Sequence, residues 1–109
     1  MKNVLICGAG VAGPSLAYWL GRRGVACTVV ERAPALRKGG QAVDFRGPVH
    51  RAVLERMDLW RAIHERRTSG GDVVLLDRRG ASAAVLPAVM TAGDVEILRG
   101  DLSSLLHER

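Results

Sequence analysis

The sequence predicts an α/β protein that begins with a strand–helix–strand unit, and three observations lead to this fold class. Residues 4–7 form a short, continuous apolar run, as in a parallel strand covered on both faces. Residues 8–13 form a glycine-rich turn, and Pro14 then suits the first turn of a helix, where a missing N–H costs nothing. Residues 27–31 are a β-branched run that ends on an acid. Short connections between these elements imply a right-handed crossover and parallel strands.

The rest of the chain alternates short strands with helices. Four further strands are predicted from apolar or β-branched runs bounded by turn residues, at 41–45, 73–76, 82–86 and 95–98. The middle two of these runs flank a turn and form an antiparallel hairpin. Pro48 opens a helix whose apolar pattern continues to Ile63, and Asp101 is expected to cap a final helix.

The glycine-rich turn has the sequence of a dinucleotide-binding fingerprint. Residues 8–13 read G-x-G-x-x-G, and the turn has the required strand before it and helix after it. In such a turn Gly8 permits the tight bend, Gly10 lets a pyrophosphate approach the backbone, and Gly13 lets the helix pack close to the strands. The sequence therefore predicts a Rossmann-type unit that binds the ADP half of a dinucleotide.

The helix start and the second strand complete this prediction. At Val11 and Ala12 the helix N-terminus offers N–H groups and the positive end of its dipole to phosphates. Glu31 ends the second strand, near the roughly 20-residue spacing that the fingerprint requires. Its carboxylate is expected to accept hydrogen bonds from the adenosine ribose and to disfavour a 2′-phosphate.

Four stretches, in this order and spacing, resemble one family. They are the fingerprint with 29–32, the stretch 36–48, the helix-end segment 54–60, and the stretch 97–102 with its R-x-x-L pattern. The chain is similar over essentially its whole length to the single-component FAD-dependent aromatic monooxygenases, the para-hydroxybenzoate hydroxylase-like family that includes tetracycline-modifying oxidases. The family usually has glycine where Asp58 stands. The family's two later FAD-binding motifs, DG and GD, have no counterpart here.

The resemblance implies a set of cofactor-binding residues. Arg32 is expected near the adenosine, and Arg99 is expected to contact FAD. The glycine-containing stretch 36–48 passes close to the flavin and pyrophosphate in the family, which makes candidates of Arg37, Asp44 and Arg46. Because the flavin carries the chemistry, no catalytic acid, base or nucleophile is expected in this segment.

The resemblance also implies a domain layout and an activity. The fold would be the N-terminal part of a Rossmann-like FAD/NAD(P)-binding domain at 1–72, the beginning of a β-rich substrate domain at 73–94, and a truncated return to the FAD-binding domain at 95–109. The parent enzyme would use NADPH or NADH and O₂ to hydroxylate an aromatic or polyketide-like small molecule. An NAD-dependent dehydrogenase-type Rossmann domain and a truncated, non-catalytic nucleotide-binding fragment are the alternatives.

Composition argues against several other classes of protein. The chain is 48% hydrophobic and 25% charged, with a mean hydropathy of +0.09, as in soluble globular proteins. No apolar run approaches the roughly 20 residues of a membrane helix, so we expect a cytoplasmic protein that does not bind membranes. Nucleic acid is not an expected partner despite the net charge of +5, because the arginines are scattered among acidic residues. The sequence does not indicate an oligomeric state.

The histidines and cysteines do not suggest a metal site. His50, His64 and His107 lack partners at the spacing of metal ligands. Cys7 and Cys27 lie in predicted strands and do not form a C-x-x-C pair, so we expect buried free thiols in a reducing compartment. The tryptophans fall within helical patterns and are expected to be packing residues.

Overall fold

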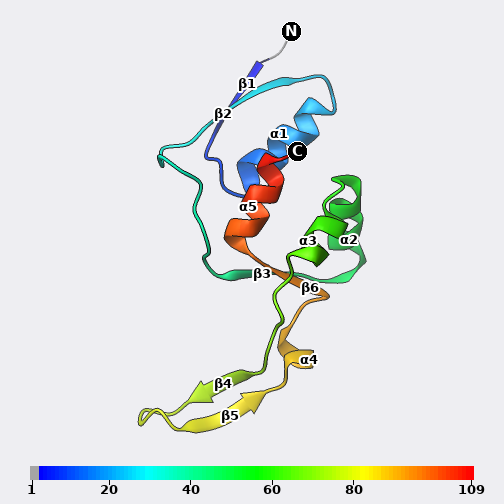
Figure 1. Cartoon of the computed structure of the whole chain (residues 1–109). Coiled ribbons are helices and arrows are strands. Elements are labelled where there is room, and N and C mark those ends of the chain that lie inside the picture. The colour runs from blue at the N-terminus through cyan, green and yellow to red at the C-terminus, as the bar shows by residue number, and fades with distance from the viewer. Residues whose placement is uncertain (1–2) are drawn as a thin grey trace.

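The computed structural model describes residues 3–109 and contains the predicted strand–helix–strand unit at its start (Figure 1). Strands β1 (Asn3–Cys7) and β2 (Ala26–Val30) pair in parallel along their whole length. Helix α1 (Ala12–Gly21) connects them and packs against both strands. The predicted α/β fold class is therefore confirmed.

The remaining elements lie between and after a second strand pair. Strand β3 (Ala42–Phe45) pairs antiparallel with β6 (Val95–Leu98). The elements between them are α2 (Gly47–Arg56), α3 (Trp60–Glu65), β4 (Val73–Leu76), β5 (Ser82–Leu86) and α4 (Ala88–Thr91). Helix α5 (Arg99–His107) follows β6 directly and contacts α1 (Figure 1). The β3–β6 pair therefore carries the last helix back to the first one.

The buried core lies where α2, α3, β6 and α5 meet. It consists of Leu54, Met57, Leu59, Ile63, Val95, Ile97, Leu102, Leu105 and Leu106. Tyr18 and Trp19 of α1 and Trp60 of α3 are half-buried against it. The two tryptophans thus pack as the sequence predicts.

One predicted helix is two helices in the structure, and Asp58 separates them. Asp58 has a φ of 55°, in the left-handed region that ends many helices and that favours glycine. The N–H of Leu59 donates to the carbonyl oxygen of Leu54 at 2.9 Å, and that of Asp58 to the carbonyl oxygen of Glu55 at 3.0 Å. These two bonds close the end of α2, which explains why glycine is expected at this position.

The predicted hairpin is present and extends away from the rest of the chain (Figure 1). β4 and β5 pair antiparallel, with Val74 opposite Val85. We call residues 73–91, which comprise β4, β5 and α4, the hairpin arm. None of its residues is buried.

The expectation that β1 is covered on both faces, with buried cysteines, is wrong. Leu5 is 65% exposed, whereas Ile6 on the opposite face is 7% exposed. Cys7 is an exposed free thiol and Cys27 is half-buried. Within residues 3–109, β1 pairs with β2 alone, and α1 packs on the face that carries Ile6. Within residues 3–109, β1 is therefore covered on one face only.

Among residues 3–109, no helix has the length and apolarity that crossing a membrane requires.

Candidate dinucleotide-binding site

The glycine turn between β1 and α1 has three glycines in three different surroundings. Gly8 has a φ of 104°, and its N–H donates to the carbonyl oxygen of Val30 at 2.7 Å. A Cβ on Gly13 would lie 1.9 Å from the carbonyl oxygen of Gly8, so any side chain there would force helix and turn apart. A Cβ on Gly10 would meet no atom within 4 Å. The fold itself requires Gly8 and Gly13, whereas Gly10 leaves open space for a ligand.

The N-terminus of α1 opens toward this space. Its N-cap residue, Val11, makes no side-chain capping hydrogen bond. Within residues 3–109, the N–H groups of Gly10, Val11, Ala12 and Gly13 have no acceptor. Unpaired donors at the positive end of a ten-residue helix suit an anionic ligand such as a phosphate.

Glu31 stands at the end of β2 and supports the turn. Its Oε2 accepts a hydrogen bond from the N–H of Ala9, and its Oε1 accepts one from the N–H of Ala33, both at 2.8 Å. These backbone donors, Ala33 first, lower the pKa of the Glu31 carboxyl below its usual value. A carboxylate has about four acceptor positions, so Glu31 retains capacity for a ligand hydroxyl.

Both backbone polar groups of Ala9, its N–H and its carbonyl oxygen, are hydrogen-bonded. Glu31 accepts from its N–H, and Nε2 of His107, at the end of α5, donates to its carbonyl oxygen at 3.1 Å. Ala9 itself is 7% exposed. The shape of the glycine turn therefore depends on β2 and on the last helix together.

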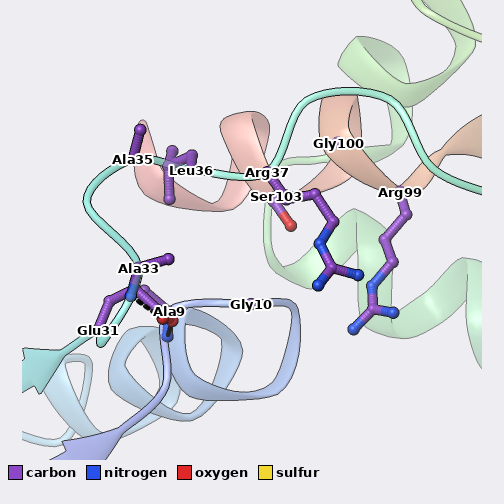
Figure 2. Close-up of a pocket in the computed structure, with 10 residues that line it drawn as sticks. All are labelled: Ala9, Gly10, Glu31, Ala33, Ala35, Leu36, Arg37, Arg99, Gly100 and Ser103. Atoms are coloured by element: carbon purple, nitrogen blue, oxygen red, sulfur yellow. Dashed lines mark hydrogen bonds between the residues drawn. The ribbon is translucent and has the colours of Figure 1, made fainter.

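A cavity of about 290 Å³ lies beside the turn. The turn, the loop after β2 and the start of α5 form its walls (Figure 2). The lining residues are Ala9, Gly10, Glu31, Ala33, Ala35, Leu36, Arg37, Arg99, Gly100 and Ser103. In Figure 2 the guanidinium groups of Arg37 and Arg99 extend side by side into the same space, and Glu31 lies at the other end. The cavity is thus cationic at one end and anionic at the other.

The start of α5 is tied to the loop that carries Arg37. The N–H of Gly100 donates to the carbonyl oxygen of Gly39 at 2.9 Å, and that of Arg99 to the carbonyl oxygen of Gln41 at 3.1 Å. A Cβ on Gly100 would lie 2.5 Å from the nitrogen of Gly39. Glycine at position 100 therefore permits the close approach that brings Arg37 and Arg99 together.

The prediction that Asp101 caps α5 is wrong. The helix begins at Arg99, and its N-cap residue is Leu98. Backbone carbonyls of the loop 39–41 satisfy its first N–H groups, which is a tertiary contact that helix-capping rules do not foresee. Asp101 instead lies in the first turn, where its charge favours the helix dipole.

Of the predicted residues, Gly10, Glu31, Arg37 and Arg99 line the cavity. Gly8, Val11, Ala12 and Gly13 belong to the adjoining glycine turn and helix start without lining it, and Arg32, Asp44 and Arg46 lie elsewhere. Oδ1 of Asp44 accepts from the N–H of Gly93 at 2.9 Å, and the guanidinium of Arg46 donates to the carbonyl oxygen of Ala92. Both side chains thus join β3 to the segment before β6. Arg32 is exposed beside Glu31 and does not line the cavity.

Sequence reasoning missed several lining residues. Ala33, Ala35 and Leu36 contribute small or apolar surface, which has no recognisable sequence signal. Gly100 and Ser103 had a usable signal, because both belong to the helix that begins at Arg99. Ser103 follows Arg99 by four positions and so shares its helix face.

No cluster of three or more His, Cys, Asp or Glu side chains within the described part of the chain could hold a metal ion.

Comparison with known proteins identifies a family. The family model described as the FAD binding domain matches residues 1–85. An uncharacterized protein of Mycobacterium tuberculosis is 44% identical over 113 residues, covering 98% of this chain and 30% of that protein. A flavin-dependent monooxygenase of Legionella longbeachae is 36% identical over 112 residues, covering 95% of this chain and 28% of the relative.

Solved structures agree with this result. The crystal structure of the tetracycline destructase Tet(51) is similar over 99% of this chain and 28% of its own, with a TM-score of 0.80 and 38% identity. CtdE, crystallised with FAD and a substrate, shares the fold with a TM-score of 0.73 at 21% identity. The chain spans less than a third of the length of these relatives.

Proposed function

Because the chain belongs to the FAD-binding domain family, we propose that it binds FAD in the cavity beside the glycine turn. We further propose that it forms the FAD-binding portion of a flavin-dependent monooxygenase. Such an enzyme would take electrons from NADPH or NADH and use O₂ to hydroxylate an aromatic or polyketide-like small molecule. The names of the relatives support this activity, since several are flavin-dependent monooxygenases.

The observation that carries the proposal is the meeting of three distant segments at one cavity. The glycine turn contributes Gly10, whose N–H has no acceptor within residues 3–109. The loop and α5 add the guanidinium groups of Arg37 and Arg99. This arrangement suits a diphosphate, which carries negative charge and many acceptor oxygens. Glu31 lies at the opposite end, where a ribose hydroxyl can donate to it.

The remaining predicted residues fit this orientation of the ligand. Arg32 follows Glu31 in the chain, so we place it beside the adenosine. Asp44 and Arg46 come from β3 and the turn after it, beyond the arginine end of the cavity. We propose that they support the wall on which the flavin lies, since they already join β3 to residues 92 and 93.

The size of the cavity is consistent with half of the cofactor. Its volume of about 290 Å³ lies at the small end of the roughly 300–1,000 Å³ found in ligand pockets. It therefore suits the ADP half, and the flavin half would extend beyond the arginines. Bound FAD supplies the redox chemistry of such an enzyme, while the protein binds and orients it.

The domain layout follows from the same reasoning. We assign 1–72 and 95–109 to the FAD-binding domain and 73–94 to the start of a substrate domain, because the first two segments share the core and the hairpin does not. Turnover is proposed for a protein of the relatives' length, and the 109-residue chain alone is expected to be inactive. Its free thiols, Cys7 and Cys27, fit a reducing compartment such as the cytoplasm.

Fluorescence titration of FAD against the purified chain tests the binding proposal. We expect saturable quenching of flavin fluorescence, reversed by ADP and only weakly by NADP⁺, because a 2′-phosphate would face Glu31. Replacing Arg99 with alanine removes a charge-assisted contact and should weaken binding at least about tenfold. Arg61→Ala is the matched control, since that side chain is 91% exposed on α3. Preference for NAD⁺ over FAD would favour a dehydrogenase-type domain instead.

A further inference from the structure

Ser103 is a buried polar residue that sequence reasoning did not single out. It lies on α5, is 6% exposed and lines the cavity. Within residues 3–109 the Ser103 hydroxyl has no hydrogen-bond partner, and its oxygen is accessible to solvent. In Figure 2 the hydroxyl points from α5 toward the space above the glycine turn. Because Ser103 lines the cavity, its hydroxyl is accessible from that space and free to donate a hydrogen bond to a ligand there.

The position of Ser103 on its helix makes it a neighbour of Arg99. The two residues are four positions apart, so their side chains share one face of α5. Both line the cavity, and Gly100 between them makes the tight contact with the loop 37–39. The face of α5 that meets the cavity therefore carries one cation and one neutral hydroxyl donor.

The next residue along the helix provides a contrast. Ser104 also has a hydroxyl, but its Oγ donates to the carbonyl oxygen of Gly100 at 3.1 Å, one turn earlier in the same helix. Ser104 does not line the cavity. The two serines therefore differ in one respect that matters for binding, because one hydroxyl is already used by the helix and the other faces the cavity.

We propose that the Ser103 hydroxyl is a further ligand of the bound dinucleotide and donates a hydrogen bond to its diphosphate. This inference rests on the proposed binding of FAD in this cavity. A phosphate oxygen is the partner that fits, since the same space receives the guanidinium groups of Arg37 and Arg99. Hydrogen bonds to charged acceptors are stronger than those between neutral groups.

The test compares Ser103→Ala with Ser104→Ala in the full 109-residue chain. FAD, ADP and adenosine serve as three probes. All three contain the adenosine, whereas only FAD and ADP contain the diphosphate. Ser103→Ala should bind FAD and ADP about tenfold more weakly than the wild-type chain, and its affinity for adenosine should not change. Ser104→Ala should bind all three probes within about twofold of wild type. Alanine is favourable in a helix, so equal thermal midpoints are expected for both variants.

The outcomes separate the two proposals. If the wild-type chain binds neither FAD nor ADP, the proposed function fails and the role of Ser103 fails with it. If the wild-type chain binds both and Ser103→Ala matches Ser104→Ala, the role of Ser103 alone is overturned. An equal loss for adenosine and ADP would also overturn it, because that result indicates a general change in the shape of the cavity.

Discussion

The hairpin arm and the remainder of the chain use apolar residues in opposite ways. We call the remainder, residues 3–72 and 92–109, the head. In the head, Ile97 is 0% exposed and Leu102 is 1% exposed. In the hairpin arm, Val74 and its partner Val85 are 50% and 51% exposed. Both regions form the strands that their sequences predict, but buried apolar residues accompany those strands in the head alone.

The difference teaches which interactions each region needs. In the hairpin arm the turn is closed locally, because Oδ1 of Asp77 accepts from the N–H groups of Arg79 and Ala81 at 2.7 and 2.9 Å. An isolated two-stranded hairpin is marginally stable in water. In the head, β3 pairs with β6 although the whole hairpin arm lies between them in the sequence. This pairing of distant segments places α5 against the glycine turn. The candidate site therefore depends on tertiary contacts that the hairpin arm does not make.

The largest expected effect comes from removing a core side chain of the head. Ile97→Ala should lower the free energy of unfolding by about 2–5 kcal/mol, since Ile97 is fully buried in β6. Val74→Ala in the hairpin arm is the control and should change it by less than about 0.5 kcal/mol. Urea denaturation measures both values. A similar loss for the two variants would show that the arm belongs to the same cooperative unit.

Alanine at two positions of the glycine turn, Gly13 and Gly10, should separate folding from binding. Gly13→Ala places a Cβ against the carbonyl oxygen of Gly8, so we expect about 1–3 kcal/mol less stability and weaker FAD binding. Gly10→Ala meets no atom and should keep its stability while FAD binding falls. Thermal unfolding and FAD titration of both variants check this. Normal FAD affinity in Gly10→Ala would place the diphosphate elsewhere.

Acidification should weaken the head through Glu31. Because its pKa is lowered by folding, the carboxylate stabilises the folded state above its usual pKa of 4.5. This contribution is lost as the pH falls through the lowered value. Glu31→Gln should therefore be less stable than wild type at about pH 7, and the gap should narrow toward about pH 3. Urea midpoints across this range measure the gap, and a constant gap would contradict the assignment. Because the side chain is exposed, the effect is expected to be modest.

The smallest expected effects come from substitutions at two residues with a left-handed backbone, Asp58 in the head and Gly80 in the hairpin arm. Asp58→Gly should stabilise the head by about 0.5–1 kcal/mol, since Asp58 has a φ of 55°. The reverse kind of change in the hairpin arm, Gly80→Ala at a φ of 78°, should strain the turn without altering global unfolding. Urea denaturation combined with amide exchange of residues 73–86 distinguishes local from global effects. Global destabilisation by Gly80→Ala would contradict the separation of the two regions.

Much of the first unit could be predicted because its signals are local. Gly8 and Gly13 stand where the turn needs a positive φ and a missing Cβ, and both requirements arise within six residues. The hairpin likewise follows from alternating apolar runs and one turn. The break at Asp58 could be anticipated only through the family resemblance, which implies glycine at this position, since aspartate itself does not mark a helix end.

The sequence by itself determined the strand–helix–strand unit, the glycine turn and the acid at the end of β2. Tertiary structure decided which arginines share a cavity. Arg37 and Arg99 line it because Gly39 and Gly100 allow the loop and α5 to touch, whereas Asp44 and Arg46 are used to join β3 to the segment before β6. It also decided that Cys7 is exposed and that Ser103 faces the cavity. The physical reason is the pairing of β3 with β6, which joins residues about fifty positions apart and leaves no periodic trace in either segment.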